Sequence, residues 1–160
     1  MYLEISPRRT GKCRRLAKAI IKTVEEGHNA VVFFPNVRMA RYFKQKYLQD
    51  LPNNLWTPIE DMEQYNLWLK VHGDRHPRIF VDEFDYVEEF PLSDDGYYST
   101  TPRFMRTEDD MEYGYLSDAL VRLLSMNHGT YTTMAPTRQN NSTTLPEFIY
   151  QIEVLGRAFD

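Results

Sequence analysis

Short apolar runs alternate with helical stretches along this chain, and that alternation restricts the fold more than any other feature. Residues 29–35 (NAVVFFP) and 78–83 (RIFVDE) are rich in β-branched and aromatic side chains, which is typical of strands buried on both faces of a parallel sheet. Residues 1–6 alternate apolar and polar positions and predict a shorter first strand. Residues 129–135 (GTYTTMA) predict a fourth strand, which Pro136 would end.

Helices are expected at residues 13–26, 36–48, 61–71, 115–126 and 146–159. Gly27 is expected to end the first of them as a C-terminal cap, and the third is expected to expose Trp68. Strands that alternate with helices favour an α/β three-layer sandwich around a mostly parallel sheet of about four to five strands. We therefore expect a single domain, residues 1–160, with an irregular acidic and aromatic excursion over residues 85–113.

The composition excludes several protein classes. Aromatic residues make up 14% and charged residues 26% of the chain, which suits a folded globular protein and is too apolar for a disordered one. No run approaches the roughly eighteen apolar residues of a membrane span, and the first residues do not read as a secretion signal. Cys13 is the single cysteine, so neither an internal disulfide nor a CxxC metal site is expected. A cytoplasmic protein fits best, in the host cytoplasm if the gene is viral.

The charges are divided unevenly. Residues 1–50 hold eleven Lys and Arg residues, whereas residues 82–113 hold eleven Asp and Glu residues. A basic half suits a polyanion, either a nucleotide or a nucleic acid. The simpler alternative is that both charge runs are solvated surface.

Residues 6–13 (SPRRTGKC) join the first strand to the first helix. That context is the one in which a G-x-x-x-x-G-K-[ST] loop binds phosphate, with backbone N–H groups at a helix N-terminus beside a lysine. Gly11 would let the backbone approach the phosphate oxygens, and Lys12 would contact the outer phosphates. The expected phosphate-binding residues are Pro7, Arg8, Thr10, Gly11, Lys12, Cys13 and Arg14.

Two positions depart from that loop pattern. Ser6 stands where the first glycine is usual, and Cys13 replaces the hydroxyl that binds Mg²⁺. A thiol is a poor ligand for this hard cation, so phosphate binding is better supported than hydrolysis. Cys13 could pack as a small apolar residue, or it could be a nucleophile whose pKa is lowered by the helix N-terminus, Lys12 and Arg14.

The third apolar run ends in two carboxylates. In a nucleoside triphosphatase Asp82 would hold Mg²⁺ through water, and Glu83 would orient or deprotonate the attacking water. Asp85 completes a D-E-x-D string, which is also a common way for a strand to enter an acidic loop. The separation from Lys12, with one strand–helix unit between, is what a phosphate-loop domain requires.

The loop SPRRTGK and the strand IFVDEFD together resemble the motor core of phage large terminases and of related helicase-like P-loop ATPases. The resemblance implies a RecA-like core that binds ATP and Mg²⁺, with Asp82 on the metal side and Glu83 catalytic. It also implies that Arg8 or Arg9 acts on the γ-phosphate, and Arg9 is the residue expected to be catalytic. Residues 130–135, with Thr132 and Thr133, are similar to that family's coupling motif. Cys13 departs from the family pattern, and the chain has room for neither a nuclease domain nor a second motor lobe.

Other side chains carry weaker signals. His72 and His76 lie close together but have no third metal ligand at a suitable spacing, so surface histidines are expected. The aromatic residues of segment 85–113 could stack bases beside Arg103 and Arg106, could bind a protein partner, or could pack onto their own domain.

Three functional hypotheses follow from these patterns. The first is an ATP-type nucleotide-binding protein, possessing at most a weak ATPase activity, that acts in phage or mobile-element DNA metabolism. The second is a catalytically inactive P-loop scaffold that binds a host or viral protein through residues 85–113. The third is nucleic-acid binding, to DNA above all, through residues 8–46, with an affinity that falls steeply with salt. No membrane partner is expected.

Overall fold

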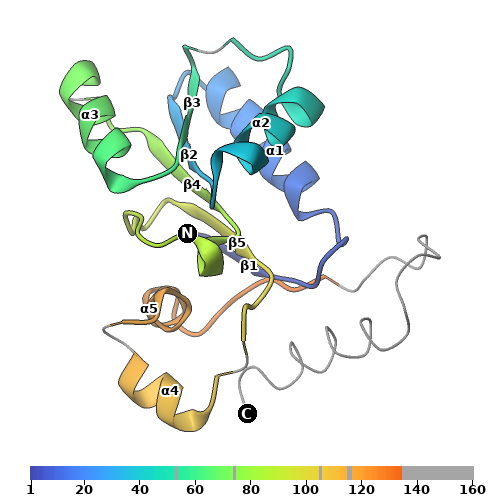
Figure 1. The fold of residues 1–160 in the computed structure, drawn as a ribbon, viewed down its shortest axis with the longest axis vertical. Coiled ribbons are helices and arrows are strands. Elements are labelled where there is room, and N and C mark those ends of the chain that lie inside the picture. Colours follow the sequence, from blue (N-terminus) through green and yellow to red (C-terminus); the bar gives the residue numbers. More distant parts are fainter. Residues whose placement is uncertain (53, 74, 105, 115–116, 135–160) are drawn as a thin grey trace.

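A single sheet of five parallel strands forms the centre of the molecule (Figure 1). The computed structural model describes residues 1–134 apart from residues 53, 74, 105, 115 and 116. The strands are β1 (Tyr2–Ile5), β2 (Ala30–Phe33), β3 (Trp56–Ile59), β4 (Arg78–Asp82) and β5 (Tyr97–Thr100). They lie in the order β1-β5-β4-β2-β3, and each neighbouring pair is parallel. The α/β class and the parallel sheet are as expected from the sequence.

Three helices connect the first four strands and begin or end where the sequence indicates. They are α1 (Lys12–Glu25), α2 (Val37–Tyr47) and α3 (Met62–His72). The side chain of Asn36 caps α2 by accepting a hydrogen bond from the backbone N–H of Met39, and Asp61 caps α3 in the same way. Gly27 follows α1 with a φ of +85°, the left-handed conformation that ends many helices at a glycine.

The apolar core is divided between the two faces of the sheet. Val32 and Phe80 pack with Leu16 of α1 and Phe43 of α2. Alternate strand residues point to the opposite face, where a second cluster packs against α3 and against α5 (Ala119–Met126). Figure 1 shows this arrangement, with α1 and α2 on one side of the sheet and α3 and α5 on the other.

Residues 50–77 contain a strand that the sequence analysis did not predict. β3 extends the sheet beside β2 and buries Trp56. The expected exposure of Trp68 is wrong, because its side chain is 7% exposed and its indole N–H donates to the Thr57 hydroxyl across 3.2 Å. The apolar side chain that α3 exposes most is Val71.

Segment 85–113 is more regular than expected. It contains β5 and α4 (Glu108–Tyr113), and the short 3-10 helix η1 (Phe84–Tyr86) overlaps its start. The expectation of an irregular excursion is therefore wrong for these elements. β5 consists of only four residues, two of them polar, and it is stabilised by pairing with β1 and β4 rather than by its own apolar pattern.

The predicted strand at 129–135 is reduced to a single parallel bridge between Thr132 and Glu4. The backbone N–H of Ile5 donates to the Thr132 carbonyl, and the N–H of Thr132 donates to the Leu3 carbonyl. The predicted helix at 115–126 begins at Ala119, with Asp118 as its cap, while residues 115 and 116 lie outside the described residues. The predicted helix at 146–159 also lies outside them. Within the described part of the chain no helix is long and apolar enough to cross a membrane.

Candidate functional site

The loop between β1 and α1 is closed by its own hydrogen bonds. Thr10 donates its hydroxyl to the Pro7 carbonyl across 2.8 Å, and Arg15 donates to the Thr10 carbonyl across 2.7 Å. Arg15 also forms an ion pair with Glu4, which is completely buried in β1. Gly11 precedes α1 with a φ of +86°, a conformation that glycine adopts without steric cost. The loop is thus fixed to both the strand and the helix that flank it.

Ser6 occupies the position of the usual first glycine and is fully buried. Its hydroxyl accepts a hydrogen bond from the backbone N–H of Met134 across 3.0 Å. The hydroxyl therefore links the start of the loop to the chain segment beside β1, which a glycine at this position would not do.

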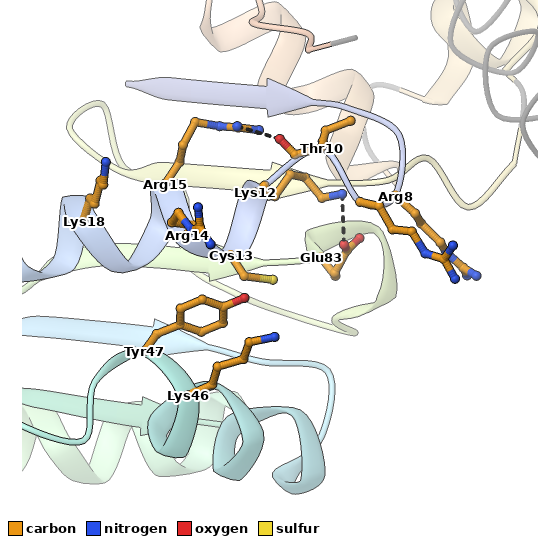
Figure 2. A pocket seen from close by; sticks show the side chains of 12 residues that line it. Arg8, Thr10, Lys12, Cys13, Arg14, Arg15, Lys18, Lys46, Tyr47 and Glu83 are labelled. Carbon is orange, nitrogen blue, oxygen red and sulfur yellow. Dashed lines mark hydrogen bonds and ion pairs between the residues drawn. The ribbon is translucent and has the colours of Figure 1, made fainter. Parts of the chain in front are cut away.

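Lys12 is the first residue of α1, and its side chain is 5% exposed. Its ammonium group donates to the Thr101 hydroxyl across 2.7 Å and to the carbonyls of Ser6 and Pro7 across 3.3 and 3.2 Å. The same nitrogen lies 3.4 Å from a carboxylate oxygen of Glu83, as Figure 2 shows. Lys12 and the glutamate after β4 are therefore in direct contact, 71 positions apart in the sequence.

Glu83 immediately follows β4 with a φ of +50°, which is uncommon for a residue other than glycine. Its second carboxylate oxygen accepts a hydrogen bond from the backbone N–H of Thr101 across 2.7 Å, and the Thr100 hydroxyl lies 3.4 Å from the same oxygen. The Glu83 carboxylate thus connects Lys12 to the end of β5, and it holds the loop at residues 6–13 close to the end of β4.

Asp82 lies behind Glu83 and is 2% exposed. Burial raises the pKa of its carboxyl group, the neighbouring Glu83 charge acts in the same direction and Lys12 opposes both, and the resulting pKa is about 7. The hydroxyl of Ser99 donates to Asp82 across 3.3 Å. This carboxyl group is therefore partly protonated near neutral pH.

β5 and Thr101, which follows it, supply the residues that sequence reasoning missed. The strand lies between β1, which leads into the loop, and β4, which leads into the carboxylates. Ser99, Thr100 and Thr101 contact Asp82, Glu83 and Lys12 respectively. The run of three hydroxyl residues is the sequence signal that could have indicated them. It predicts contacts with Lys12 and the carboxylates only if β5 is already known to lie between β1 and β4.

A cavity of about 750 Å³ opens in front of the loop. Seven basic side chains and one carboxylate line it (Figure 2). Its lining consists of Arg8, Arg9, Thr10, Gly11, Lys12, Cys13, Arg14, Arg15, Lys18, Lys46, Tyr47 and Glu83. Such an excess of positive charge in a concave site attracts anions.

The predicted site residues are mostly brought together here. All the expected phosphate-binding residues except Pro7 line the cavity, as do Arg9 and Glu83. Pro7 contributes only its carbonyl oxygen, which accepts from Lys12 and Thr10. Asp82 is not part of the lining and lies behind it.

Cys13 is half-buried in the wall of the cavity. Burial raises the pKa of its thiol to about 11, and the charge of Asp82 acts in the same direction. The effects that raise the pKa of the thiol exceed the lowering effect of Lys12, which disfavours the interpretation of Cys13 as a thiolate nucleophile. The thiol packs as a small apolar group.

The histidines do not form a metal site. Among the described residues no group of three His, Cys, Asp or Glu side chains is arranged to hold a metal ion. His72 instead stacks on Trp68 with its ring centroid 4.0 Å away, and its Nδ1 lies 2.9 Å from the Trp68 carbonyl oxygen.

Much of the aromatic and charged content of segment 85–113 packs onto its own domain. Tyr98 is fully buried, and its hydroxyl accepts from the backbone N–H of Ser93. The Arg106 guanidinium is almost completely buried and forms ion pairs with both Asp85 and Asp118. Phe104 remains exposed, as does Tyr113 on α4.

Comparison with known proteins gives no relative from which to transfer a role. No protein-family model, no curated protein and no solved structure matches this chain.

Proposed function

We propose that this protein binds the phosphates of an ATP-type nucleotide in the cavity in front of Lys12, and that it hydrolyses the bound nucleotide slowly. The observation that supports this most is the contact between Lys12 and Glu83 at 3.4 Å, at the edge of the sheet where parallel strands present ligand sites. A candidate phosphate-binding cation and a candidate general base thus lie side by side in the lining of one anion-attracting cavity.

The local geometry supports the proposal of phosphate binding. α1 is fourteen residues long and begins beside the cavity, so its free N–H groups and its dipole favour an anion there. Gly11 leaves no side chain between the backbone and a phosphate oxygen. Because Lys12 is held by neutral carbonyl and hydroxyl oxygens as well as by Glu83, a phosphate can replace the carboxylate while those other contacts remain.

Hydrolysis would use the glutamate that the phosphate displaces. A water oxygen attacks the γ-phosphorus, Glu83 takes the proton from the water, and the bond between the γ-phosphorus and the bridging oxygen breaks to release the diphosphate. Arg9 is the cavity residue that we assign to the developing charge on the γ-phosphate. Its φ of +62° is part of the loop conformation.

Asp82 fits a magnesium ion in part. Mg²⁺ in such sites takes one or two carboxylates, waters and phosphate oxygens, and Asp82 is a buried carboxyl group next to Glu83. The ion would neutralise charge on the phosphates. Cys13 offers it no oxygen, and protonation of Asp82 near neutral pH competes with it. Because of both effects, we expect the protein to bind nucleotide but to hydrolyse it slowly.

Calorimetric titration with ATP and Mg²⁺ tests the proposal. Replacing Lys12 by Ala should weaken binding roughly 10- to 150-fold, the loss of a hydrogen bond to a charged group. Glu83→Gln should retain binding and lower turnover by about a hundredfold or more. Lys44→Ala, on α2 outside the cavity lining, is the matched control. Absence of binding at about 1 mM nucleotide would contradict the proposal, and unchanged turnover in Glu83→Gln would remove Glu83 from the mechanism.

A non-catalytic scaffold is the second candidate, and the position of Asp82 favours it, because this carboxyl group is 2% exposed and lies outside the cavity lining. In that case the exposed Phe104 and Tyr113 of segment 85–113 are the anchors for a protein partner. A protein that retains its fold but binds no ATP would support this second candidate.

A further inference from the structure

The cavity extends beyond the phosphate loop to a second helix. Tyr47 and Lys46, at the C-terminal end of α2, belong to its lining together with Arg14 and Lys18 of α1. Figure 2 shows Tyr47 on the side of the cavity that faces Cys13 and Arg14. The two helices contact each other on the same face of the sheet, so the far wall of the cavity is fixed relative to Lys12.

The ring of Tyr47 is held in place by its neighbours. Phe43, which is buried in the core, packs against it with ring centroids 5.2 Å apart and a tilt of 46°. The ammonium group of Lys46 lies 5.4 Å from the Tyr47 ring centroid and donates a hydrogen bond to the hydroxyl of Tyr42 across 2.7 Å. A ring fixed in this way loses little conformational entropy when a ligand contacts it.

We propose that Tyr47 is the wall on which the base of the bound nucleotide stacks, with its triphosphate at Lys12. This inference rests on the proposed function and adds to it the site for the base. Every nucleobase presents a flat π-face that stacks on an aromatic side chain, and the cations of Arg14 and Lys18 in the cavity lining suit the opposite face of the base.

The size and chemistry of the cavity support a whole nucleotide rather than phosphate alone. Its volume of about 750 Å³ lies within the range of roughly 300–1,000 Å³ that is typical for complete small-molecule ligands. The contacts suited to phosphate cluster at the loop, around Gly11 and Lys12. Tyr47 is the one aromatic residue in the lining of this cavity, and a triphosphate has no group that an aromatic ring binds.

The test compares ATP with methyl triphosphate, which carries the same triphosphate ester without ribose or base. Calorimetry should show that the wild-type protein binds ATP more tightly than methyl triphosphate. Tyr47→Leu should weaken ATP binding roughly 5- to 150-fold, the range for loss of one stacked base, and leave methyl triphosphate binding unchanged. Tyr47→Phe should retain ATP affinity, because the ring remains. Tyr113→Leu, at an exposed tyrosine outside the cavity lining, is the control.

Three results would overturn the inference. Equal affinity of the wild-type protein for ATP and methyl triphosphate would show that the base makes no contact, whatever the variants do. Unchanged ATP affinity in Tyr47→Leu would exclude Tyr47 as the wall. Equal weakening of both ligands in Tyr47→Leu would assign the residue to the shape of the site instead. If the wild-type protein binds neither ligand, both the proposed function and this inference fail. If it binds both ligands and only the Tyr47 variants behave differently from expectation, this inference fails and the proposed function stands.

Discussion

The buried carboxyl group of Asp82 should make the ligand-free protein less stable as the pH rises. Its pKa is raised from 3.8 to about 7 in the folded state, so the folded protein binds this proton more tightly than the unfolded chain does. A group of this kind stabilises the fold fully below its unfolded pKa, and the contribution is lost as the pH rises through the folded pKa. The pKa shift of about 3 units corresponds to a loss of about 4 kcal/mol in the free energy of unfolding when the pH rises above 7.

Asp82→Asn removes the titration but keeps the shape and the oxygen that accepts from Ser99. The free energy of unfolding of the variant should therefore exceed that of the wild-type protein by about 4 kcal/mol at about pH 8.5, and by less than about 1 kcal/mol at about pH 4. Urea unfolding of both proteins across this pH range, with a chelator and without nucleotide, measures the difference. An Asn variant whose stability follows that of the wild-type protein at every pH would refute the reasoning.

Three further changes should have measurable outcomes. Arg106→Met should lower the free energy of unfolding by about 3–5 kcal/mol in urea, since it leaves two carboxylates without their buried partner; a loss below about 1 kcal/mol would mean that water replaces the guanidinium. At about pH 8 Cys13 should react with iodoacetamide far more slowly than a free thiol, because a pKa of about 11 leaves about one thiolate in a thousand; rapid labelling of the native protein would contradict this. Gly11→Ala should lower the free energy of unfolding by about 1–2 kcal/mol because of the positive φ at this position. The loss should be larger than for Gly27→Ala, because of these two glycines only Gly11 has a neighbour that the added carbon would meet, Arg15 at 3.2 Å. Equal urea midpoints for the two variants would argue against that contact.

The parts of the fold that could be predicted are those that local sequence specifies. β2 and β4 are continuous apolar runs, and the capping residues Asn36 and Asp61 mark the starts of α2 and α3. β3 was not predicted; it contains Pro58 and lies at the edge of the five-stranded sheet, where a proline is tolerated. Trp68 is buried because β3 provides the surface against which α3 packs, and that surface was not predicted.

The two motifs of the candidate site could be predicted from the sequence, but the residues that connect them in space could not. Lys12 and Glu83 each follow a predicted strand, and the rule that ligands bind at the carboxyl edge brings them to the same edge. The contact of both residues with Thr101 depends on β5 being inserted between β1 and β4. The place of Tyr47 depends on how α2 crosses α1. Neither strand order nor helix crossing can be read from local sequence, since both arise from packing between distant segments.

The position of β1 has a consequence for the order in which the chain acquires structure during synthesis. β2, β3 and β4 are neighbours in the sheet and are complete once residue 82 has been made. β1 is synthesised first, yet the strand with which it pairs is β5, at residues 97–100. The first strand must therefore wait for most of the described chain before it can join the sheet, because non-local contacts form late. The loop after β1 should therefore reach its native conformation late, because its contacts with Thr100 and Thr101 form only after β5 has been made.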